Sequence, residues 1–351
     1  MEREVNLVFD IGKTHKKVLL FDRRLEVLHQ QEERLPETVD EDGFPCEDAA
    51  LLERWMDERK SECSAEKGFL IRGINFSTYG ATLVHLDSTG KRCAPVYNYL
   101  KPLPGKVLEG FYERYEGVEE FSRRTASPAL GMLNSGLQLL WIKREKPELC
   151  RKLKMVLHLP QYLSYRLTGR ISSEPTSIGC HTAMWDFDHM QYHPWLRKEG
   201  FLLPKPREVT ETMPVQVGQT AIRTGPGIHD SSAALVPYLL HARAPFTLVS
   251  TGTWCITMNP FNREKLTSEE LRQDCLCFLS FRGDPVKSSR FFMGHIHDLN
   301  VRMMEDHFRV ERNSHRTITP GPEVLGRTWR EAEEPVFFRD WDPPGPQKPE
   351  D

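Results

Sequence analysis

The stretch Asn6–Asp22, NLVFDIGKTHKKVLLFD, predicts two strands joined by a tight turn, and the rest of the chain is organised around it. One apolar run ends at a carboxylate, a polar turn follows, and a second apolar run begins; the polar residues in question are Asp10, Gly12, Lys13, Thr14, Lys16 and Lys17. Backbone N–H groups, a threonine hydroxyl and lysine ammonium groups at such a turn can converge on a phosphate, and Asp10 can hold Mg²⁺ through water. An ordinary surface hairpin with solvated lysines explains this stretch alone equally well.

The composition excludes several classes of protein. The chain has 351 residues, enough for two domains, and a net charge of −3, which gives no basic excess to suggest nucleic acid. Its 8 cysteines are scattered without the spacing of a disulfide scaffold. No apolar run approaches the length of a membrane span, and the first residues, MEREVN, are not a signal peptide. We therefore expect a cytoplasmic protein that does not bind a membrane.

The next expected elements complete the order strand, strand, strand, helix, strand. They are a third strand over Leu25–Gln31, a helix over Ala49–Ser64, and strands over Phe69–Phe76 and Thr82–Leu86. This order is typical of the start of the ribonuclease-H-like fold that sugar kinases, actin and heat-shock ATPases share. The expected fold class is therefore α/β, of the ribonuclease-H-like type.

The middle of the chain is expected to be helical, over Ser135–Lys146, Glu148–Met155 and Leu159–Leu167. Strands return over Phe246–Ser250 and Cys255–Met258, with Thr251, Gly252 and Thr253 between them. This second strand, turn and strand is like the unit around Asp10. Duplicated domains of the same fold, with two phosphate-binding hairpins that face each other across a cleft, would explain both.

A third signal is the segment Gly225–Pro237, GPGIHDSSAALVP, in which a glycine-rich turn leads to His229, Asp230 and a helix. Asp230 can cap that helix. It can instead act as a general base toward a substrate hydroxyl, since the helix dipole favours a carboxylate there and the glycines allow close approach. Phosphoryl transfer needs phosphate-binding loops, a metal-linked carboxylate and such a base, and the three motifs together supply them.

These motifs resemble the FGGY-type carbohydrate kinases, most closely the rhamnulokinase and fuculokinase branch. Five segments within Val5–Phe308 occur in the family's order: DIGKTHKK at the first phosphate loop, STYGATLVHLDSTGKRCAPVYNY at the sugar-side strand, LPQYLSYRLTGRISSEPTSIG after the helical middle, IHDSSAA at the catalytic base, and STGTWCI at the second phosphate loop. No one of them is decisive, but five in order are specific.

The resemblance implies ATP and Mg²⁺ as cofactors and a small sugar, such as a deoxyhexulose or ketopentose, as substrate. It implies Asp230 as the catalytic base. The residues it implies for the phosphates are Asp10, Gly12, Lys13, Thr14, Lys17, Thr251, Gly252 and Thr253, with Asp10 also near Mg²⁺; those for the sugar are Thr78, Tyr79, Gly80, His229 and Asp230. Tyr79 would pack on one face of the sugar, although a half-buried strand aromatic explains it equally well.

Two departures from the family pattern matter. Glycerol kinases carry Arg-Glu where this chain has Gly80-Ala81, which argues against glycerol, and the rhamnulokinase pattern has an acidic residue at Thr82. Family-like sequence stops near Phe308, so the domains we expect are a sugar-kinase domain over 1–240, an incomplete ATP-binding domain over 241–310 and a poorly ordered tail over 311–351. No adenosine-binding motif is visible. His295, His297 and Asp298 could be read as a metal site, but solvated or structural roles explain them better.

Three functions are left open. The first is an ATP-dependent sugar kinase, the second an inactive fragment that keeps the sugar-binding half, and the third an ATPase or regulator that phosphorylates no sugar. The partner we expect is a small-molecule sugar, with a homodimer as an option and neither nucleic acid nor membrane.

Overall fold

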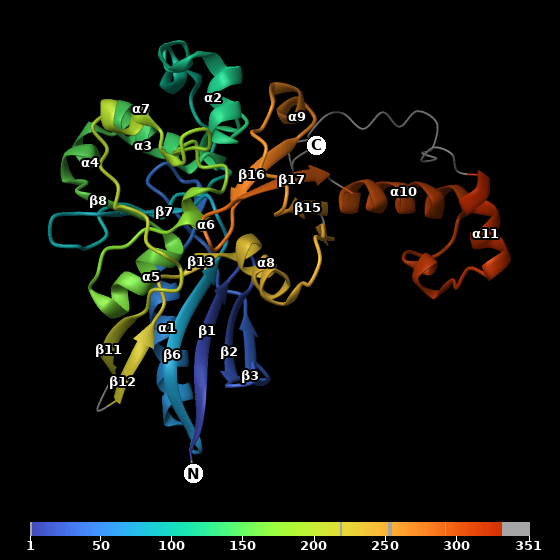
Figure 1. Cartoon of the computed structure of the whole chain (residues 1–351), viewed down its shortest axis with the longest axis horizontal. Helices are drawn as coiled ribbons and strands as arrows, with labels where there is room; N and C mark the ends of the chain where they lie inside the picture. Colours follow the sequence, from blue (N-terminus) through green and yellow to red (C-terminus); the bar gives the residue numbers. More distant parts are fainter. Residues whose placement is uncertain (1, 218–219, 252–254, 292, 332–351) are drawn as a thin grey trace. The chain divides into compact units, whose positions relative to one another are not determined.

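The computed structural model describes residues 2–217, 220–251, 255–291 and 293–331 (Figure 1). The chain forms two compact units. Unit 1 consists of Met1–Thr247 and Asn259–Ser288, and unit 2 of Leu248–Met258 and the chain from Ser289 onward. The chain therefore leaves and re-enters unit 1 within the second half of the sequence. The domain limits expected from the sequence differ from these units and stay predictions.

A mixed sheet forms the centre of the first part of unit 1. Its strands are β1 (Arg3–Ile11), β2 (Lys16–Asp22), β3 (Val27–Glu33), β6 (Phe69–Thr78), β11 (Met213–Val217), β12 (Thr220–Thr224) and β13 (Ile228–His229). The strand order is β11-β12-β6-β1-β2-β3, and β13 also pairs with β6. β1, β2 and β3 are antiparallel, whereas β1, β12 and β13 each run parallel to β6. The predicted three-stranded meander is confirmed.

The third strand begins at Val27, two residues later than predicted. The carboxylate of Asp22 accepts hydrogen bonds from the backbone N–H groups of Arg24 and Glu26, and this holds the turn before β3. Leu25 lies in that turn with φ +64°. A strand cannot include this backbone conformation, so the leucine that extended the predicted strand belongs to the turn.

One face of the sheet packs against α1 (Ala49–Ala65) and α5 (Leu159–Thr168). The side chains of β1 alternate, so Val5, Leu7, Phe9 and Ile11 are buried on this face. Asp48 caps α1 by accepting a 2.9 Å hydrogen bond from the Leu51 N–H, and Trp55 meets the ring of Phe9 at 5.8 Å between centroids. Asp10, between Phe9 and Ile11, points to the opposite face.

A second apolar core lies under the helices of the middle of unit 1. The helices there are α2 (Gly117–Thr125), α3 (Ser135–Glu145), α4 (Pro147–Lys152), α6 (Pro175–Ile178) and α7 (Pro194–Lys198), with 3₁₀ turns η1 (Gly105–Leu108), η2 (Tyr112–Tyr115) and η3 (Gly131–Leu133). Unit 1 also contains two short strand pairs: β4 (Thr38–Val39) with β5 (Pro45–Cys46), and β9 (Trp185–Asp186) with β10 (Gln191–Tyr192). Trp195 and Phe111 are fully buried at the centre of this core.

The prediction of a helix over Glu148–Met155 is wrong at its end. α4 stops at Lys152, and β8 (Met155–His158) pairs antiparallel with β7 (Leu83–Leu86). Pairing with a strand seventy residues earlier decides the conformation of this short apolar run. Its own periodicity cannot distinguish the two structures.

Residues 259–288 complete unit 1. They form α9 (Ser268–Arg272), β16 (Cys275–Leu279) and the first part of β17 (Pro285–Phe291). Leu279 is 1% exposed and lies against Gly179, where an added Cβ would stand 2.4 Å from its Cγ. Arg123 Nη1 donates a 3.0 Å hydrogen bond to the Leu266 carbonyl. This segment is thus bound to the body of unit 1 by both apolar and polar contacts.

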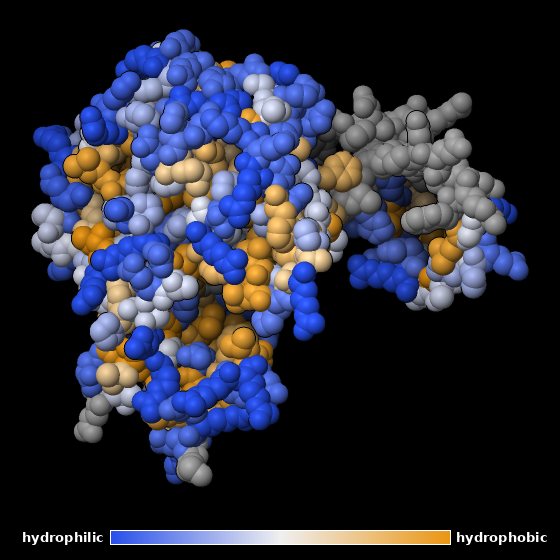
Figure 2. Space-filling model, in the orientation of Figure 1, coloured by the Kyte–Doolittle hydropathy of each residue, from blue (hydrophilic) through white to orange (hydrophobic). Residues whose placement is uncertain are grey.

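Unit 2 contains β14 (Leu248–Ser250) antiparallel to β15 (Cys255–Asn259), then α10 (Met293–Phe308), η4 (Ser314–Thr317) and α11 (Pro322–Glu331). The strands predicted on either side of Thr251 are confirmed. Within the predicted tail the structure describes η4 and α11, and residues 332–351 lie outside the described part. In the part of the chain that is described, no helix is both long and apolar enough to cross a bilayer. On the face shown in Figure 2 hydrophilic side chains predominate, with smaller apolar areas among them.

Candidate active site

The candidate site lies where three parallel strands end. β1, β6 and β13 are adjacent, and their register places Asp10 beside Ser77 and Ser77 beside Ile228. Since the carboxyl ends of parallel strands meet at one edge of a sheet, the residues that follow them gather there. Asp230 begins α8 (Asp230–His241) directly after β13. The sequence-predicted carboxylates Asp10 and Asp230 are therefore brought to the same edge.

Asp230 occupies the first position of its helix, as predicted. Its Oδ1 accepts a 2.6 Å hydrogen bond from the Ser231 N–H and lies 3.2 Å from His229 Nε2. The side chain is 39% exposed, so the carboxylate remains accessible from solvent. The carboxylate thus accepts the N–H of the next residue and does not cap α8, whose N-cap position is His229, and it is open enough to meet a substrate hydroxyl.

Asp10 lies close enough to Asp230 for their charges to interact. Burial raises the pKa of Asp10, the negative charge of Asp230 adds to the rise, and Lys17 and a side-chain hydrogen bond with Ser77 oppose it. Lys17 is the residue directly opposite Asp10 in the β1–β2 register. Two neighbouring carboxylates, one of them half-buried, form an arrangement that a bound cation would stabilise.

The backbone before Asp230 is held in place by side chains from two other elements, β6 and α5. Asn75 Oδ1 accepts a 3.0 Å hydrogen bond from the Gly227 N–H, and Gln161 Nε2 donates to the Gly227 carbonyl at 3.0 Å. Ser164 Oγ donates to the Gly225 carbonyl at 2.8 Å. Gly227 has φ +77°, and an added Cβ would stand 2.6 Å from the Pro160 carbonyl oxygen. The loop is therefore fixed by α5 on one side and β6 on the other.

A buried carboxylate, that of Glu174, supports the same loop through Thr176. Glu174 accepts hydrogen bonds from the Thr176 N–H and the Ser177 N–H, both at 2.7 Å, and so caps α6. Thr176 Oγ1 donates to Glu174 and accepts a 2.9 Å hydrogen bond from the His229 N–H. The segment LPQYLSYRLTGRISSEPTSIG, which the family resemblance singled out, thus acts by positioning the loop that carries Asp230.

His229 is buried and lies against Gly80. A Cβ added to Gly80 would stand 2.9 Å from His229 Nε2, so a glycine is needed there for the imidazole to approach the backbone. Burial lowers the pKa of His229, while the nearby Asp230 charge raises it. Cys180 Sγ lies 3.4 Å from the same Nε2. The predicted sugar-side residues Gly80 and Asp230 therefore both lie close to the imidazole of His229.

The lysines of the turn after β1 present less positive charge to solvent than predicted. Lys17 pairs with Glu32 at 3.6 Å, Lys13 pairs with Glu37, and Thr14 is exposed. The Gly12 N–H donates to the His15 carbonyl at 2.9 Å, which closes the tight turn. The expectation that Lys16 joins the phosphate-binding cations is wrong. Its side chain is 2% exposed and points into the protein.

Tyr79 and Thr78 are also more deeply buried than a freely accessible sugar platform would be. Tyr79 is 8% exposed, and its hydroxyl donates a 3.0 Å hydrogen bond to Glu47. Thr78 is fully buried, and its Oγ1 donates to the Tyr79 carbonyl. The ring of Tyr79 lies 6.2 Å from that of Tyr99. Their sugar-binding roles stay predictions.

The second predicted phosphate turn is described only at its first residue. Thr251 belongs to unit 2 and is exposed, and Gly252 and Thr253 lie outside the described residues. Among the side chains that the structure describes, no group of three or more His, Cys, Asp or Glu residues is placed to hold a metal ion. The side chain of His295 is outside that set, so the reading of His295, His297 and Asp298 as solvated or structural stays a prediction.

Sequence reasoning missed Ser77, Glu47 and the buried role of Lys16. Ser77 could have been found, since it is the residue beside Asp10 once two parallel strands are expected. Glu47 gave no signal, because the loop before α1 has no periodicity that would place it near the turn.

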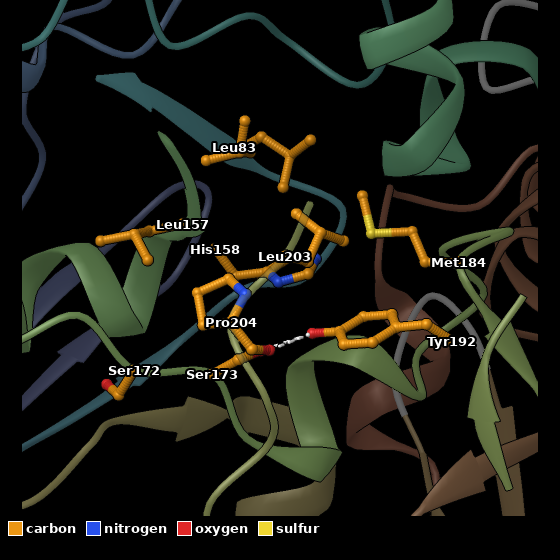
Figure 3. Close-up of a pocket in the computed structure, with 10 residues that line it drawn as sticks. Leu83, Leu157, His158, Ser172, Ser173, Met184, Tyr192, Leu203 and Pro204 are labelled. Atoms are coloured by element: carbon orange, nitrogen blue, oxygen red, sulfur yellow. Dashed lines mark hydrogen bonds between the residues drawn. The ribbon is translucent and has the colours of Figure 1, made fainter. Parts of the chain in front are cut away.

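A cavity lies elsewhere in unit 1, beneath β7 and β8 (Figure 3). Its lining includes Leu83, His158, Ser172 and Tyr192, and burial lowers the pKa of His158 to about 3. None of the sequence-predicted site residues lines it. We therefore assign the site to the strand ends and not to this cavity.

Comparison with known families decides the relationship. Residues 5–202 match the model described as "FGGY family of carbohydrate kinases, N-terminal domain". The chain belongs to the FGGY family of carbohydrate kinases. Residues 243–330 match the FGGY C-terminal domain, so the family's second domain extends beyond Phe308, where the sequence resemblance ended.

Among curated FGGY relatives, an L-fuculokinase of Salmonella typhi is 24% identical over 74% of this chain and 57% of its own length. A rhamnulokinase of Yersinia pestis bv. Antiqua (strain Angola) is 29% identical over 61% of this chain and 45% of its own length. The chain thus spans about half the length of these relatives. The predicted similarity to the rhamnulokinase and fuculokinase branch is confirmed.

Solved structures agree with the family. A carbohydrate kinase from Novosphingobium aromaticivorans matches with a TM-score of 0.76 and 28% identity, over 86% of this chain and 66% of that one. Plasmodium falciparum glycerol kinase with ADP matches with a TM-score of 0.72 at 15% identity, over 90% of this chain and 65% of that one, which bears on the fold alone. The predicted fold class, that of the actin, hexokinase and heat-shock ATPase superfamily, is confirmed.

Proposed function

We propose that this FGGY chain catalyses ATP-dependent phosphorylation of a hydroxyl of a small sugar, such as a deoxyhexulose or ketopentose. The observation that carries the proposal is the placement of Asp10 and Asp230 at one sheet edge, with Asp230 39% exposed at the start of α8. Similarity to an L-fuculokinase and a rhamnulokinase supports a sugar as the acceptor.

In this proposal Asp230 takes the proton from the sugar hydroxyl as that oxygen attacks the γ-phosphorus of ATP. The bond from this phosphorus to the β,γ-bridging oxygen breaks, and ADP is the leaving group. The hydrogen bonds to Gly225, Gly227 and His229 keep the carboxylate in place through the loop before it. Gly12, Lys13, Thr14 and Lys17 would bind phosphate oxygens, and the same role is proposed for Thr251, Gly252 and Thr253. Thr78, Tyr79, Gly80 and His229 would line the sugar.

The carboxylates fit the Mg²⁺ that such a reaction uses. Burial and the charge of Asp230 raise the pKa of Asp10, so a divalent cation held through water would relieve an existing repulsion. When bound there, Mg²⁺ would neutralise charge on the phosphates of ATP.

The test is sugar-dependent formation of ADP by the purified chain with Mg²⁺, using a panel of deoxyhexuloses, ketopentoses and ketohexoses. We expect Asp230→Asn to lower the rate by roughly 10²–10⁴-fold, the usual contribution of a general base. Asp284→Asn is the matched control, because Asp284 has a similar exposure of 37% and pairs with Arg263 away from the strand ends. The proposal is rejected if no sugar in the panel stimulates ADP formation, or if both variants behave alike.

A second function is that of a sugar-binding chain that transfers no phosphate. The observation that favours it is the apolar surface of unit 2, where Met303, Met304 and Phe308 of α10 are 42%, 42% and 67% exposed. Calorimetry separates the two functions. Sugar binding without measurable ATP binding supports the second, and binding of both with turnover supports the first.

A cytoplasmic location and a homodimer also stay proposals. Gel filtration with light scattering would measure the mass of the assembly directly, and a monomeric mass at micromolar concentration would exclude the homodimer.

A further inference from the structure

Lys16 is a buried ammonium group whose three protons all have acceptors. Its Nζ lies 3.0 Å from the Gly12 carbonyl, 3.2 Å from the Lys13 carbonyl and 3.1 Å from Glu47 Oε2. Its side chain is 2% exposed and that of Glu47 5% exposed. A lysine has three N–H donors, so this geometry uses its full capacity.

The two carbonyls that Lys16 binds fix the direction of two amide N–H groups of the turn. In a trans peptide the C=O of one residue and the N–H of the next point in opposite directions. Because the Gly12 and Lys13 carbonyls point toward Lys16, the N–H groups of Lys13 and Thr14 point away from it. Two successive N–H groups that face the same way form an anion-binding concavity. Lys16 thus orients the backbone that would bind phosphate, although it cannot reach the phosphate itself.

The same ammonium group is joined to the sugar-side strand. Glu47 Oε2 accepts both the Lys16 hydrogen bond and a 3.0 Å hydrogen bond from the Tyr79 hydroxyl. Nζ of Lys16 lies 5.8 Å from the centre of the Tyr79 ring. Tyr79 directly follows β6, in the segment that meets His229 through Gly80. A continuous chain of buried polar contacts therefore runs from the β1–β2 turn to the sugar side of the site.

We propose that Lys16 is a positioning residue, which orients the first phosphate loop and, through Glu47 and Tyr79, couples that loop to the sugar side of the site. The coupling part rests on the proposed kinase function, and the loop-orienting part does not. A buried ion pair is often no better for stability than an apolar pair of the same size. The orientation of the loop is therefore the property that Lys16 should control most strongly.

The test uses the full chain with Lys16→Met, which keeps the length and burial of the side chain and removes the charge. Amide hydrogen exchange measured on peptides covering Ile11–Lys16 should accelerate, because the Gly12 N–H to His15 carbonyl hydrogen bond loses its support. Titration with Mg²⁺ and ADP should show affinity weakened on the order of tenfold, within the range typical of coupled sites. Sugar affinity measured without nucleotide should change much less.

Lys287→Met is the matched control. Lys287 is also buried and also pairs with one carboxylate, Glu270, at 2.5 Å, but it lies on β17. We expect neither the exchange of the turn nor ADP affinity to change in this variant. Equal effects of the two substitutions would show a general loss of stability and would overturn the proposal.

Glu47→Gln tests the link, since it keeps the shape of the side chain but removes its negative charge and replaces one acceptor oxygen with an amide NH₂ donor. The measured quantity is the factor by which saturating sugar changes ADP affinity. We expect this factor to fall toward one in Glu47→Gln, and an unchanged factor would overturn the coupling. If the unmodified chain binds no nucleotide, the proposed function fails. The exchange experiment then decides the loop-orienting role by itself, and unaltered exchange in Lys16→Met overturns it.

Discussion

Replacement of Gly227 by alanine should distort the loop that carries Asp230. Gly227 lies two residues before His229, with φ +77°, and its N–H donates to Asn75 Oδ1. An alanine there must adopt a left-handed backbone and also place a methyl group 2.6 Å from the Pro160 carbonyl oxygen and 2.8 Å from the Pro160 carbonyl carbon. These neighbours are backbone atoms of α5, so they cannot rotate away.

The expected loss of stability has two parts. The left-handed backbone costs an L-residue roughly 1–2 kcal/mol. Forcing a methyl group into a packed site costs roughly 1–3 kcal/mol more. The sum, about 2–5 kcal/mol, is a large fraction of the 5–15 kcal/mol that typically holds a domain folded.

Gly43→Ala separates the two parts. Gly43 has φ +78°, and no atom lies within 4 Å of the position of an added Cβ. This variant therefore meets the backbone strain alone. The effect of alanine on the unfolded chain is common to both substitutions and cancels when they are compared. We expect Gly227→Ala to be less stable than Gly43→Ala by about 1–3 kcal/mol.

Urea unfolding followed by circular dichroism measures the two free energies. The rate of sugar-dependent ADP formation, measured at urea concentrations below the unfolding transition, reports on the loop itself. This rate should fall in Gly227→Ala only. If the two variants are equally stable and equally active, the contact with Pro160 does not constrain the loop, and the reasoning about its rigidity is refuted.

Three further predictions concern the surroundings of the site. Thr176→Val keeps the shape of the side chain but leaves the His229 N–H without its 2.9 Å acceptor, so it should lower the free energy of unfolding in urea by about 1–3 kcal/mol. It should lower kcat by a larger factor than it changes the KM for the sugar, and a change in KM alone would contradict this prediction. Leu279→Ala should cost about 2–5 kcal/mol by opening a cavity against Gly179, whereas Leu202→Ala, at 82% exposure, should stay within about 0.5 kcal/mol. Burial lowers the pKa of His85 from 6.5 to about 4, so between these pH values the folded chain binds fewer protons than the unfolded chain. The free energy of unfolding should therefore decrease as the pH falls from 6.5 toward 4, by up to roughly 1.4 kcal/mol per pH unit. His85→Phe should reduce this loss in unfolding measurements at pH 6.5 and 4.5, and an unchanged pH dependence would count against it.

The sequence was sufficient to predict the helices and strands whose signals lie within their own residues. The hairpin after Asn6, the helix from Ala49 and the helix that begins at Asp230 were all predictable from apolar periodicity, turn residues and helix starts. Asp10 and Asp230 could be assigned to one site because phosphoryl transfer needs both a metal-linked carboxylate and a base, whereas the parallel strand ends that bring them together were not predicted.

Contacts between distant segments could not be predicted in this way. Lys16 looks like Lys17 in the sequence, yet it is buried because Glu47, thirty-one residues later, accepts its hydrogen bond. Met155 continues an apolar run that fits a helix, but β7 pairs with it as a strand. In both cases the deciding partner is far along the chain, where periodicity and turn chemistry carry no information.

The return of residues 259–288 to unit 1 has a consequence for how the protein is made. Leu279 fills the space against Gly179, and Ser232 of α8 donates to its carbonyl at 3.1 Å. Unit 1 therefore cannot finish its core during synthesis until this segment has left the ribosome, although the strands that carry Asp10 emerge first. We expect the N-terminal sheet to wait as a partly packed intermediate and to depend on chaperones during that interval.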